Sequence, residues 1–347
     1  MTKTKKKKQT FKIGSWIVIM LVAVFLYAAY ILFAPNVFTN SAEKSYLCIP
    51  ENSTYTEVVH LLENQANVLN ESAFKQVSSM LHYGERIRAG RYELKASMNN
   101  FQLVRLLRSG RQAPVRLTFN NIRTKEQLAA RLSMQLMADS VSILKLLNDP
   151  EFLANYKLNP ATSVSLFIPN TYEVFWNMNA AQLFERMNKE YTKFWTDERK
   201  GKAAAISLTP VEVGVLASIV EEETNNKADR PKVAGLYLNR LKKAMPLQAD
   251  PTLKFAVGDF SLKRIGIKQI LFISPYNTYR NQGLPPGPIR VASESGIDAV
   301  LNYVHHDYIY MCASETLNGE HKFATNWAEH LENAKKYQKK LNDLNIH

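Results

Sequence analysis

The longest uninterrupted apolar stretch of the sequence lies close to its start. Residues 13–34 carry no charge and are rich in Ile, Val, Leu, Ala and Phe. A helix rises ~1.5 Å per residue, so this stretch crosses a ~30 Å hydrocarbon core. Six lysines fall within the first twelve residues, and by the positive-inside rule this basic tail, residues 1–12, stays cytoplasmic. The pattern predicts a single-pass membrane anchor.

A cleaved signal peptide is the alternative reading of the same stretch. Signal h-regions usually hold ~7 to 15 apolar residues and are followed by an A-x-A-like site. The apolar run here is longer, and no such site follows it. We therefore expect a retained transmembrane helix, with everything after Pro35 outside the cytoplasm.

After the apolar stretch, helical and strand-like patterns alternate in a short region that reads as a separate unit. Residues 35–44 are polar and turn-rich and predict a tether. Residues 45–113 then predict a compact α+β module, with helices at 54–62, 73–81 and 100–107, a strand at 88–94, and Gly110 as a helix stop. Composition alone leaves a spacer and a glycan-binding module equally open.

Residues 114–347 form a larger region of mixed pattern. Strands are predicted at 115–119 and 308–312, and helices at 124–134 and 181–195. There is no regular βαβ alternation, so the fold class is α+β rather than a doubly wound sheet.

Charge and cysteine content change this picture little. The net charge is +13, but much of it belongs to the tail, and no basic stripe with interleaved aromatics follows, so nucleic acid is not an expected partner. The two cysteines, Cys48 and Cys312, exclude a disulfide framework but leave a single bridge open. The pair His305 and His306 is the one histidine cluster, and we predict no metal site and no cofactor.

The most informative segment runs from Thr209 to Thr224. Thr209, Pro210 and Glu212 predict a helix that starts with a capping box. On a helical wheel Val213, Leu216, Ile219 and Val220 form one apolar stripe, and Glu223 falls inside it.

Position on the wheel separates the three consecutive glutamates of this helix. Glu221 and Glu222 fall outside the stripe, and we interpret them as a solvated helix end. A carboxyl on the core-facing stripe is desolvated, which raises its pKa and keeps it protonated near neutral pH. Glu223 is therefore the candidate general acid.

Two polar segments downstream could complete a site. Gln248 has a free amide side chain, and Asp250, which precedes Pro251, is expected either to cap a helix or to orient a neighbouring side chain. Residues 274–289 predict a rigid loop whose aromatic and amide groups suit sugar rings and N-acetyl groups, or a purely structural role. The G-x-S-x-G, phosphate-loop and H-E-x-x-H motifs are absent from the sequence.

Together these segments resemble the endolytic murein transglycosylases, the MltG or YceG-like family. The helix motif Leu216 to Thr224 resembles the family signature, and six further motifs follow the family's order and spacing almost to the C-terminus. These motifs are Phe167 to Glu173, Val233 to Leu241, Leu247 to Thr252, Tyr276 to Tyr279, Gly283 to Gly287 and His321 to Asn326.

The resemblance implies a function and a set of residues. In the family the catalytic glutamate directly precedes a threonine, which matches Glu223. The resemblance also implies that residues 45–113 form a LysM-like subdomain and residues 114–347 a YceG-like catalytic domain. The implied partners are peptidoglycan glycan strands, the inner (cytoplasmic) membrane as the membrane that holds the anchor, and peptidoglycan polymerases. Residues expected to bind substrate are Gln248, Asp250, Tyr276, Asn277, Thr278, Glu173 and Asn326.

A lytic transglycosylase can work with one carboxylate, because the muramic C6 hydroxyl replaces water as the attacking group and leaves a 1,6-anhydro end. A muramidase would require a second carboxylate, with Glu173, Glu221 and Asp250 as candidates. A non-catalytic scaffold that binds glycan and partner proteins is a third hypothesis.

Overall fold

The computed structural model describes residues 2–38, 45–262 and 264–344, with side chains from Gly14 onward. Its contacts divide the chain into two compact units. The first holds residues up to Arg116 together with Gln135–Met137 and Glu173–Met178, and the second holds the remaining residues. In this structure Cys48 and Cys312 are both free.

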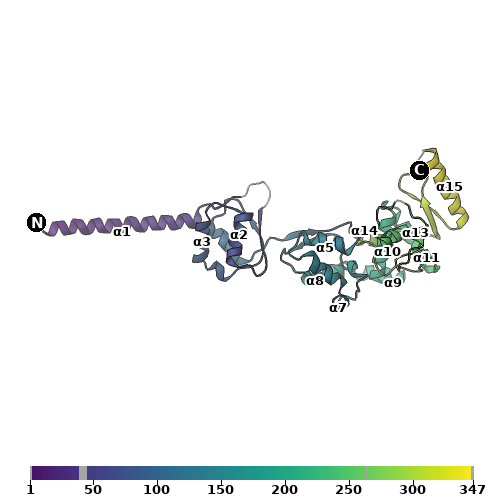
Figure 1. Ribbon diagram of the computed structural model, residues 1–347, viewed down its shortest axis with the longest axis horizontal. Helices are drawn as coiled ribbons and strands as arrows, with labels where there is room; N and C mark the ends of the chain where they lie inside the picture. Colours follow the sequence, from purple (N-terminus) through teal and green to yellow (C-terminus); the bar gives the residue numbers. More distant parts are fainter. Residues whose placement is uncertain (1, 39–44, 263, 345–347) are drawn as a thin grey trace. The chain divides into compact units, whose positions relative to one another are not determined.

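The first unit begins with the predicted anchor. Helix α1 (Thr2–Phe33) contains the apolar segment Gly14–Phe33, which is long and apolar enough to cross a membrane. Figure 1 shows α1 running into the body of this unit beside α3. The other elements are β1 (Val37–Phe38), β2 (Ser45–Ile49), α2 (Tyr55–Gln65), β3 (Asn67–Val68), α3 (Glu71–Met80), the 3₁₀ turn η1 (Tyr83–Glu85), β4 (Gly90–Leu94) and α4 (Asn100–Ser109).

Two predicted helices of this unit, α2 and α4, begin or end at the capping residues that the sequence contains. Thr54 caps α2 with a capping box to Glu57, and α4 ends at Gly110, which takes the left-handed φ of 69° that favours glycine. Strands β2 and β4 pair antiparallel, with Leu47 opposite Tyr92. Together with α2, α3 and α4 they enclose an apolar core.

The first residues of the predicted tether are part of the folded unit and do not form a free linker. Val37 is fully buried and pairs with Val68, and the buried Asn36 donates its side-chain amide to Asn100 Oδ1 at 2.6 Å. Residues 35–38 are therefore built into the first unit. The rest of the predicted tether, residues 39–44, lies outside the described residues.

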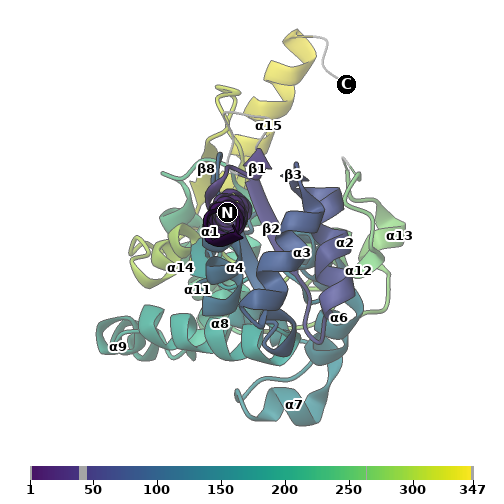
Figure 2. The same ribbon diagram turned by 90° about the vertical axis from the view of Figure 1, so that its left-hand side faces the viewer.

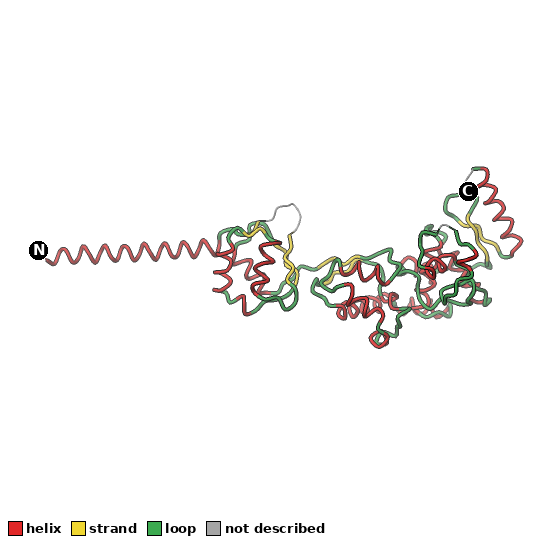
Figure 3. The backbone as a smooth tube through the Cα atoms, viewed as in Figure 1, coloured by secondary structure: helices red, strands yellow, loops and turns green. Residues whose placement is uncertain are grey.

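The second unit is mainly helical, with short strand pairs, and Figure 3 shows how small a share of the chain the strands take. The elements after α4 are β5 (Val115–Thr118), α5 (Lys125–Ser133), α6 (Ser140–Asn148), α7 (Pro150–Ala154), η2 (Ser163–Leu166), β6 (Thr171–Val174), α8 (Ala180–Phe194), α9 (Asp197–Ala205), α10 (Pro210–Glu223), α11 (Arg230–Lys242), α12 (Asp250–Val257), α13 (Ile267–Ile270), α14 (Glu294–Leu301), β7 (Tyr310–Ala313), β8 (His321–Ala324) and α15 (Trp327–Asp343). This confirms the predicted α+β class.

Candidate active site

Helix α10 carries the candidate acid and begins as predicted. The Thr209 backbone amide donates to Glu212 Oε2 at 2.7 Å, and the Glu212 amide donates to Thr209 Oγ1 at 3.3 Å, which completes a capping box. Every residue from Val213 to Glu221 is buried, because α11, α12 and α14 pack around the helix. The end of α10 is thereby held inside the second unit.

Glu223 is the last residue of α10 and is half-buried. Its Oε2 atom is buried and has no hydrogen-bond partner among the residues that the structure describes. Burial, and next the negative charge of Asp250, raise the pKa of Glu223 to about 7, while a hydrogen bond from Tyr237 and the charges of Lys254 and Arg240 oppose the rise. The predicted desolvation is confirmed, and this carboxyl can be protonated near neutral pH.

The prediction that Glu221 is solvated is wrong. Its side chain is buried and forms an ion pair with Arg230 at 3.3 Å. Ser293 donates to it twice, through Oγ at 2.5 Å and the backbone amide at 2.9 Å. A Cβ at Gly296 would lie 2.5 Å from the Glu221 carboxyl carbon, so the absence of a side chain there makes room for this carboxylate.

The prediction that Glu222 is solvated is also wrong. Arg123 binds this carboxylate with two hydrogen bonds, of 3.0 and 2.9 Å, and Arg290 adds a third at 2.9 Å. The wheel assumes that one side of the helix faces water, whereas α10 is enclosed on all sides. Glu221 and Glu222 therefore fasten the last turn of α10 and leave Glu223 as the one carboxyl of the three without a cationic partner at ion-pair distance among the described residues.

Asp250 takes a role other than the expected cap. The N-cap of α12 is Ala249, and Asp250 is the first residue within the helix. Its Oδ1 accepts a 2.5 Å hydrogen bond from the Tyr279 hydroxyl. The interpretation of Asp250 as a helix cap is wrong, and the structure instead shows a carboxylate oriented by Tyr279 whose charge acts on Glu223.

Gln248 is exposed at the start of this segment with a left-handed φ of 52°. Arg240 donates to its side-chain oxygen at 3.2 Å, and the same guanidinium donates to Leu247 O at 2.8 Å and to Ile309 O at 2.7 Å. Arg240 thus holds the turn that presents Gln248, and the amide nitrogen of Gln248 stays available for a ligand.

Asn277 and Thr278 lie inside the loop rather than on its surface. Asn277 is fully buried, and its amide donates to Ile270 O at 2.9 Å and Phe272 O at 2.7 Å. The Thr278 hydroxyl accepts from the backbone amide of Ala249 at 3.0 Å, and the Thr278 carbonyl accepts from the backbone amide of Gln248 at 3.0 Å. These contacts show that both side chains shape the loop, and their direct contact with substrate stays a prediction.

The other predicted binding residues lie in different places. Tyr276 is half-buried and packs on Phe255, with ring centroids 4.8 Å apart. Asn326 caps α15 by accepting from the Glu329 amide at 3.0 Å. Glu173 is exposed on β6 and belongs to the first unit. A contribution of these three side chains to substrate binding stays a prediction.

The arrangement can be compared with known proteins. The model of the YceG-like family matches residues 47–336. The chain belongs to the YceG-like family. It is 28% identical to the endolytic murein transglycosylase of Bacillus subtilis over 315 residues, which cover 85% of both chains. It is 27% identical to the protein of the same name from Streptococcus pneumoniae over 344 residues, which cover 87% of this chain and 60% of that one.

A crystal structure shows the same family relation. A yceG-like protein from Listeria monocytogenes is 30% identical and matches with a TM-score of 0.55, covering 84% of this chain and 99% of that one.

Sequence reasoning missed the residues that tune Glu223 in this YceG-like chain. Tyr237 is buried on α11 and lowers the pKa of Glu223, and Arg240 follows three positions later on the same helix face. The sequence signal for these residues was Arg240, which lies within the largely apolar run Val233 to Leu241. A charged residue in a buried helix needs polar partners nearby, so its position indicates a polar site.

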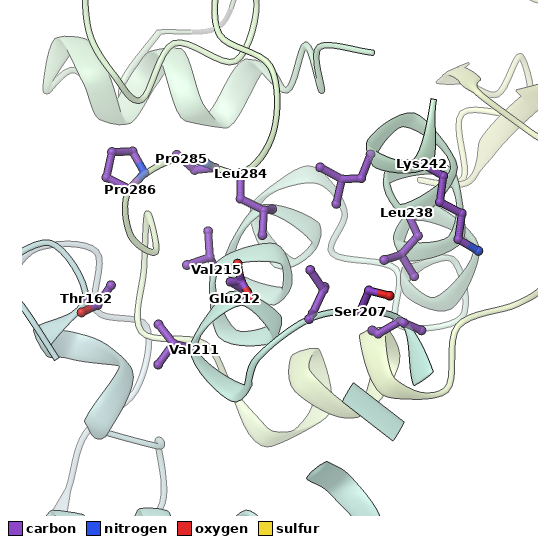
Figure 4. Close-up of a pocket in the computed structure, with 13 residues that line it drawn as sticks. Thr162, Ser207, Val211, Glu212, Val215, Leu238, Lys242, Leu284, Pro285 and Pro286 are labelled. Carbon is purple, nitrogen blue, oxygen red and sulfur yellow. The ribbon is translucent and has the colours of Figure 1, made fainter. Parts of the chain in front are cut away.

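A cavity beside α10 lies away from Glu223. It has a volume of about 500 Å³ and is lined by residues of α10, α11 and the Leu284 to Pro286 turn. Figure 4 shows Val211 and Glu212 on its wall. Glu212 is eleven residues before Glu223, or about 16 Å along the helix at ~1.5 Å per residue. This cavity belongs to the opposite end of α10.

Proposed function

We propose that this protein is an endolytic murein transglycosylase that cleaves bonds between N-acetylmuramic acid and N-acetylglucosamine without water, with Glu223 as its acid and base. One observation carries the proposal: the unpartnered, buried Oε2 of Glu223, with the pKa of this carboxyl raised to about 7. Family membership and two relatives named endolytic murein transglycosylase support it.

The reaction needs one proton and returns it. Protonated Glu223 donates to the glycosidic oxygen as the bond from C1 of the muramic ring to that oxygen breaks. The C6 hydroxyl of the same ring attacks C1, and its proton passes to the Glu223 carboxylate. Glu223 is then protonated again, the product carries a 1,6-anhydro end, and the intramolecular attack benefits from a high effective molarity.

The contacts of the other carboxylates favour this reaction over hydrolysis. A hydrolase needs a second carboxylate as nucleophile or base. Glu221 is bound by Arg230 and Ser293, and Asp250 accepts from Tyr279. We infer that Asp250 tunes Glu223 rather than attacking sugar or activating water.

The N-terminal anchor supports glycan cleavage at the outer face of the cytoplasmic membrane. With α1 across the cytoplasmic membrane and the basic tail inside, the residues after α1 lie outside the cytoplasm. We propose that the enzyme cuts nascent strands close to the membrane, that the first unit is a LysM-like glycan-binding module, and that peptidoglycan polymerases are its partners.

Strands that carry a blocking group on the muramic C6 hydroxyl test the reaction. The full chain in detergent should cleave strands with a free C6 hydroxyl and leave strands with 6-O-acetyl groups uncut, because the attacking group is lost. A muramidase uses water and would cut both. Equal cleavage of the two substrates would overturn the proposal.

Replacing Asp250 with Asn should move the alkaline limb of the pH–rate profile to lower pH. The charge of Asp250 raises the pKa of Glu223, so its loss lowers that pKa and deprotonates the acid earlier. Asn keeps an oxygen that can accept from Tyr279. Above the limb, kcat/KM should fall about tenfold for each pH unit by which the limb moves. An unmoved limb would contradict the tuning role.

Replacing Tyr237 with Phe should move the same limb in the opposite direction. The hydrogen bond from Tyr237 lowers the pKa of Glu223, so its removal raises that pKa and keeps the acid protonated to higher pH. Phe fills nearly the same buried volume. Profiles of kcat/KM against pH for both variants form a matched pair, and a shift in the same direction for both would contradict this electrostatic account.

A further inference from the structure

The first unit carries an open groove that the proposed reaction does not use. It lies between the end of β4, the loop at Lys95 to Asn99, helix α4 and the segment Arg111 to Pro114, with a volume of about 860 Å³. Met98, Phe101 and Leu106 contribute apolar side chains to its lining, beside polar residues such as Gln102 and Gln112. Helix α4, which lines the groove, also contacts α1, and both helices can be found in the end-on view of Figure 2.

The groove adjoins the end of the membrane helix. Phe101, on its wall, contacts Phe33, the last residue of α1, with ring centroids 6.0 Å apart. The backbone amides of Asn36 and Val37 both donate to Met98 O, at 2.9 and 3.0 Å. Residues that line the groove therefore touch the chain directly where the apolar span ends.

The anchor also fixes the height of this unit above the membrane. Tyr27 and Ile31 belong to the apolar span Gly14–Phe33, yet the Tyr27 hydroxyl donates to Gln76 at 3.4 Å and Ile31 O accepts from the Asn100 side chain at 2.8 Å. The unit begins before the span ends. Each headgroup layer of a bilayer is only several Å thick, so α4 starts at the level of the headgroups.

The rim of the groove is basic. Lys95, Arg105 and Arg111 line it and are exposed, and they outnumber the one carboxylate of the lining, Glu93. No ion pair among the residues with described side chains involves any of the three. Arg105 instead lies 5.6 Å from the ring centroid of Phe101. Three cations against one carboxylate, beside the apolar side chains of the lining, match a ligand with an anionic head and an apolar tail.

We propose that this groove binds the anionic headgroup of a membrane phospholipid, with Lys95, Arg105 and Arg111 on the phosphate and Phe101 against the acyl boundary. Basic residues near an anionic membrane surface each favour binding by about fivefold, or on the order of 10² for three. The bound lipid would hold the first unit against the membrane. The inference depends on the anchor and does not require the proposed reaction.

The test uses the full chain in nanodiscs of equal parts phosphatidylcholine and phosphatidylglycerol, with retained lipids identified by native mass spectrometry. The wild type should retain phosphatidylglycerol in preference to phosphatidylcholine. The variant K95Q/R105Q/R111Q should lose this preference by up to about 10²-fold, because the charges that hold the phosphate are gone.

The control K75Q/R86Q/R88Q removes the same number of cations from the same unit without touching the groove and should behave like the wild type. Unchanged circular dichroism in both variants shows that the unit is folded. Equal preference in the wild type and the groove variant, or equal loss in both variants, would overturn the assignment. Groove-dependent binding of soluble glycan strands in place of phosphatidylglycerol would overturn it as well.

Discussion

Replacing Glu223 with Gln should reduce the rate of glycan cleavage by at least about 10²- to 10⁴-fold, the usual contribution of a general acid–base residue. Gln has nearly the same shape but can neither donate the proton to the leaving oxygen nor accept one from the C6 hydroxyl. The measurement is the initial rate on uncross-linked strands below pH 7, where Glu223 is protonated in the wild type.

A stability measurement separates the loss of the catalytic group in E223Q from a loss of folding. The folded-state pKa of Glu223, about 7, lies above the ordinary value of 4.5, so folding favours the protonated form. The wild type should therefore lose up to about 3 kcal/mol of unfolding free energy as the pH rises from about 4.5 through 7. E223Q should lack this loss and be at least as stable above pH 7. A folded E223Q protein with wild-type activity would contradict the assignment.

Replacing Glu221 with Ala should destabilise the second unit by about 3–5 kcal/mol, which is typical when one partner of a buried ion pair is removed. The change leaves Arg230 and the Ser293 hydroxyl and amide without their acceptor. Arg230 also donates to Thr224 O at 3.3 Å, so the turn after Glu223 should loosen and activity should fall.

The matched control is Glu212→Ala on the same helix. Among the described residues, the hydrogen bonds of Glu212 are those of the capping box, and loss of a cap costs about 1 kcal/mol. Urea unfolding of the full chain in detergent, followed by circular dichroism, compares the two variants. Equal destabilisation by both would mean that the Glu221 cluster does not fasten α10.

Local signals in the sequence were sufficient to predict where α10, the helix that carries the candidate acid, begins. Thr209, Pro210 and Glu212 are within one turn of one another, so their capping box depends on no distant residue. The wheel position of Glu223 was likewise enough to predict its desolvation, because Val213, Leu216, Ile219 and Val220 are all buried.

The errors arose where the deciding partner is distant in sequence. Arg123 lies 99 residues before Glu222, and Arg290 lies 68 residues after it. Periodicity gives the direction of a side chain on its own helix but not what packs against it, so the enclosure of α10 could not be predicted. Asn36 was assigned to a tether for the same reason, since its partner Asn100 is 64 residues away.

The burial of the loop residues could not be predicted for a different reason. Asn277 has the amide that an N-acetyl group would require, but it is consumed by two backbone carbonyls that an irregular loop leaves unpaired. A loop has no period from which burial can be predicted. Residue type alone could therefore not distinguish a side chain that shapes the site from one that touches substrate.

The most direct test of the account is the mass of the chain ends that the wild-type protein produces from uncross-linked glycan strands. A reaction that uses Glu223 alone should yield 1,6-anhydro-muramic ends, lighter than hydrolytic ends by one water. Ordinary reducing ends carrying oxygen from ¹⁸O-labelled water would show that water attacks, and would contradict a single-carboxylate transglycosylase.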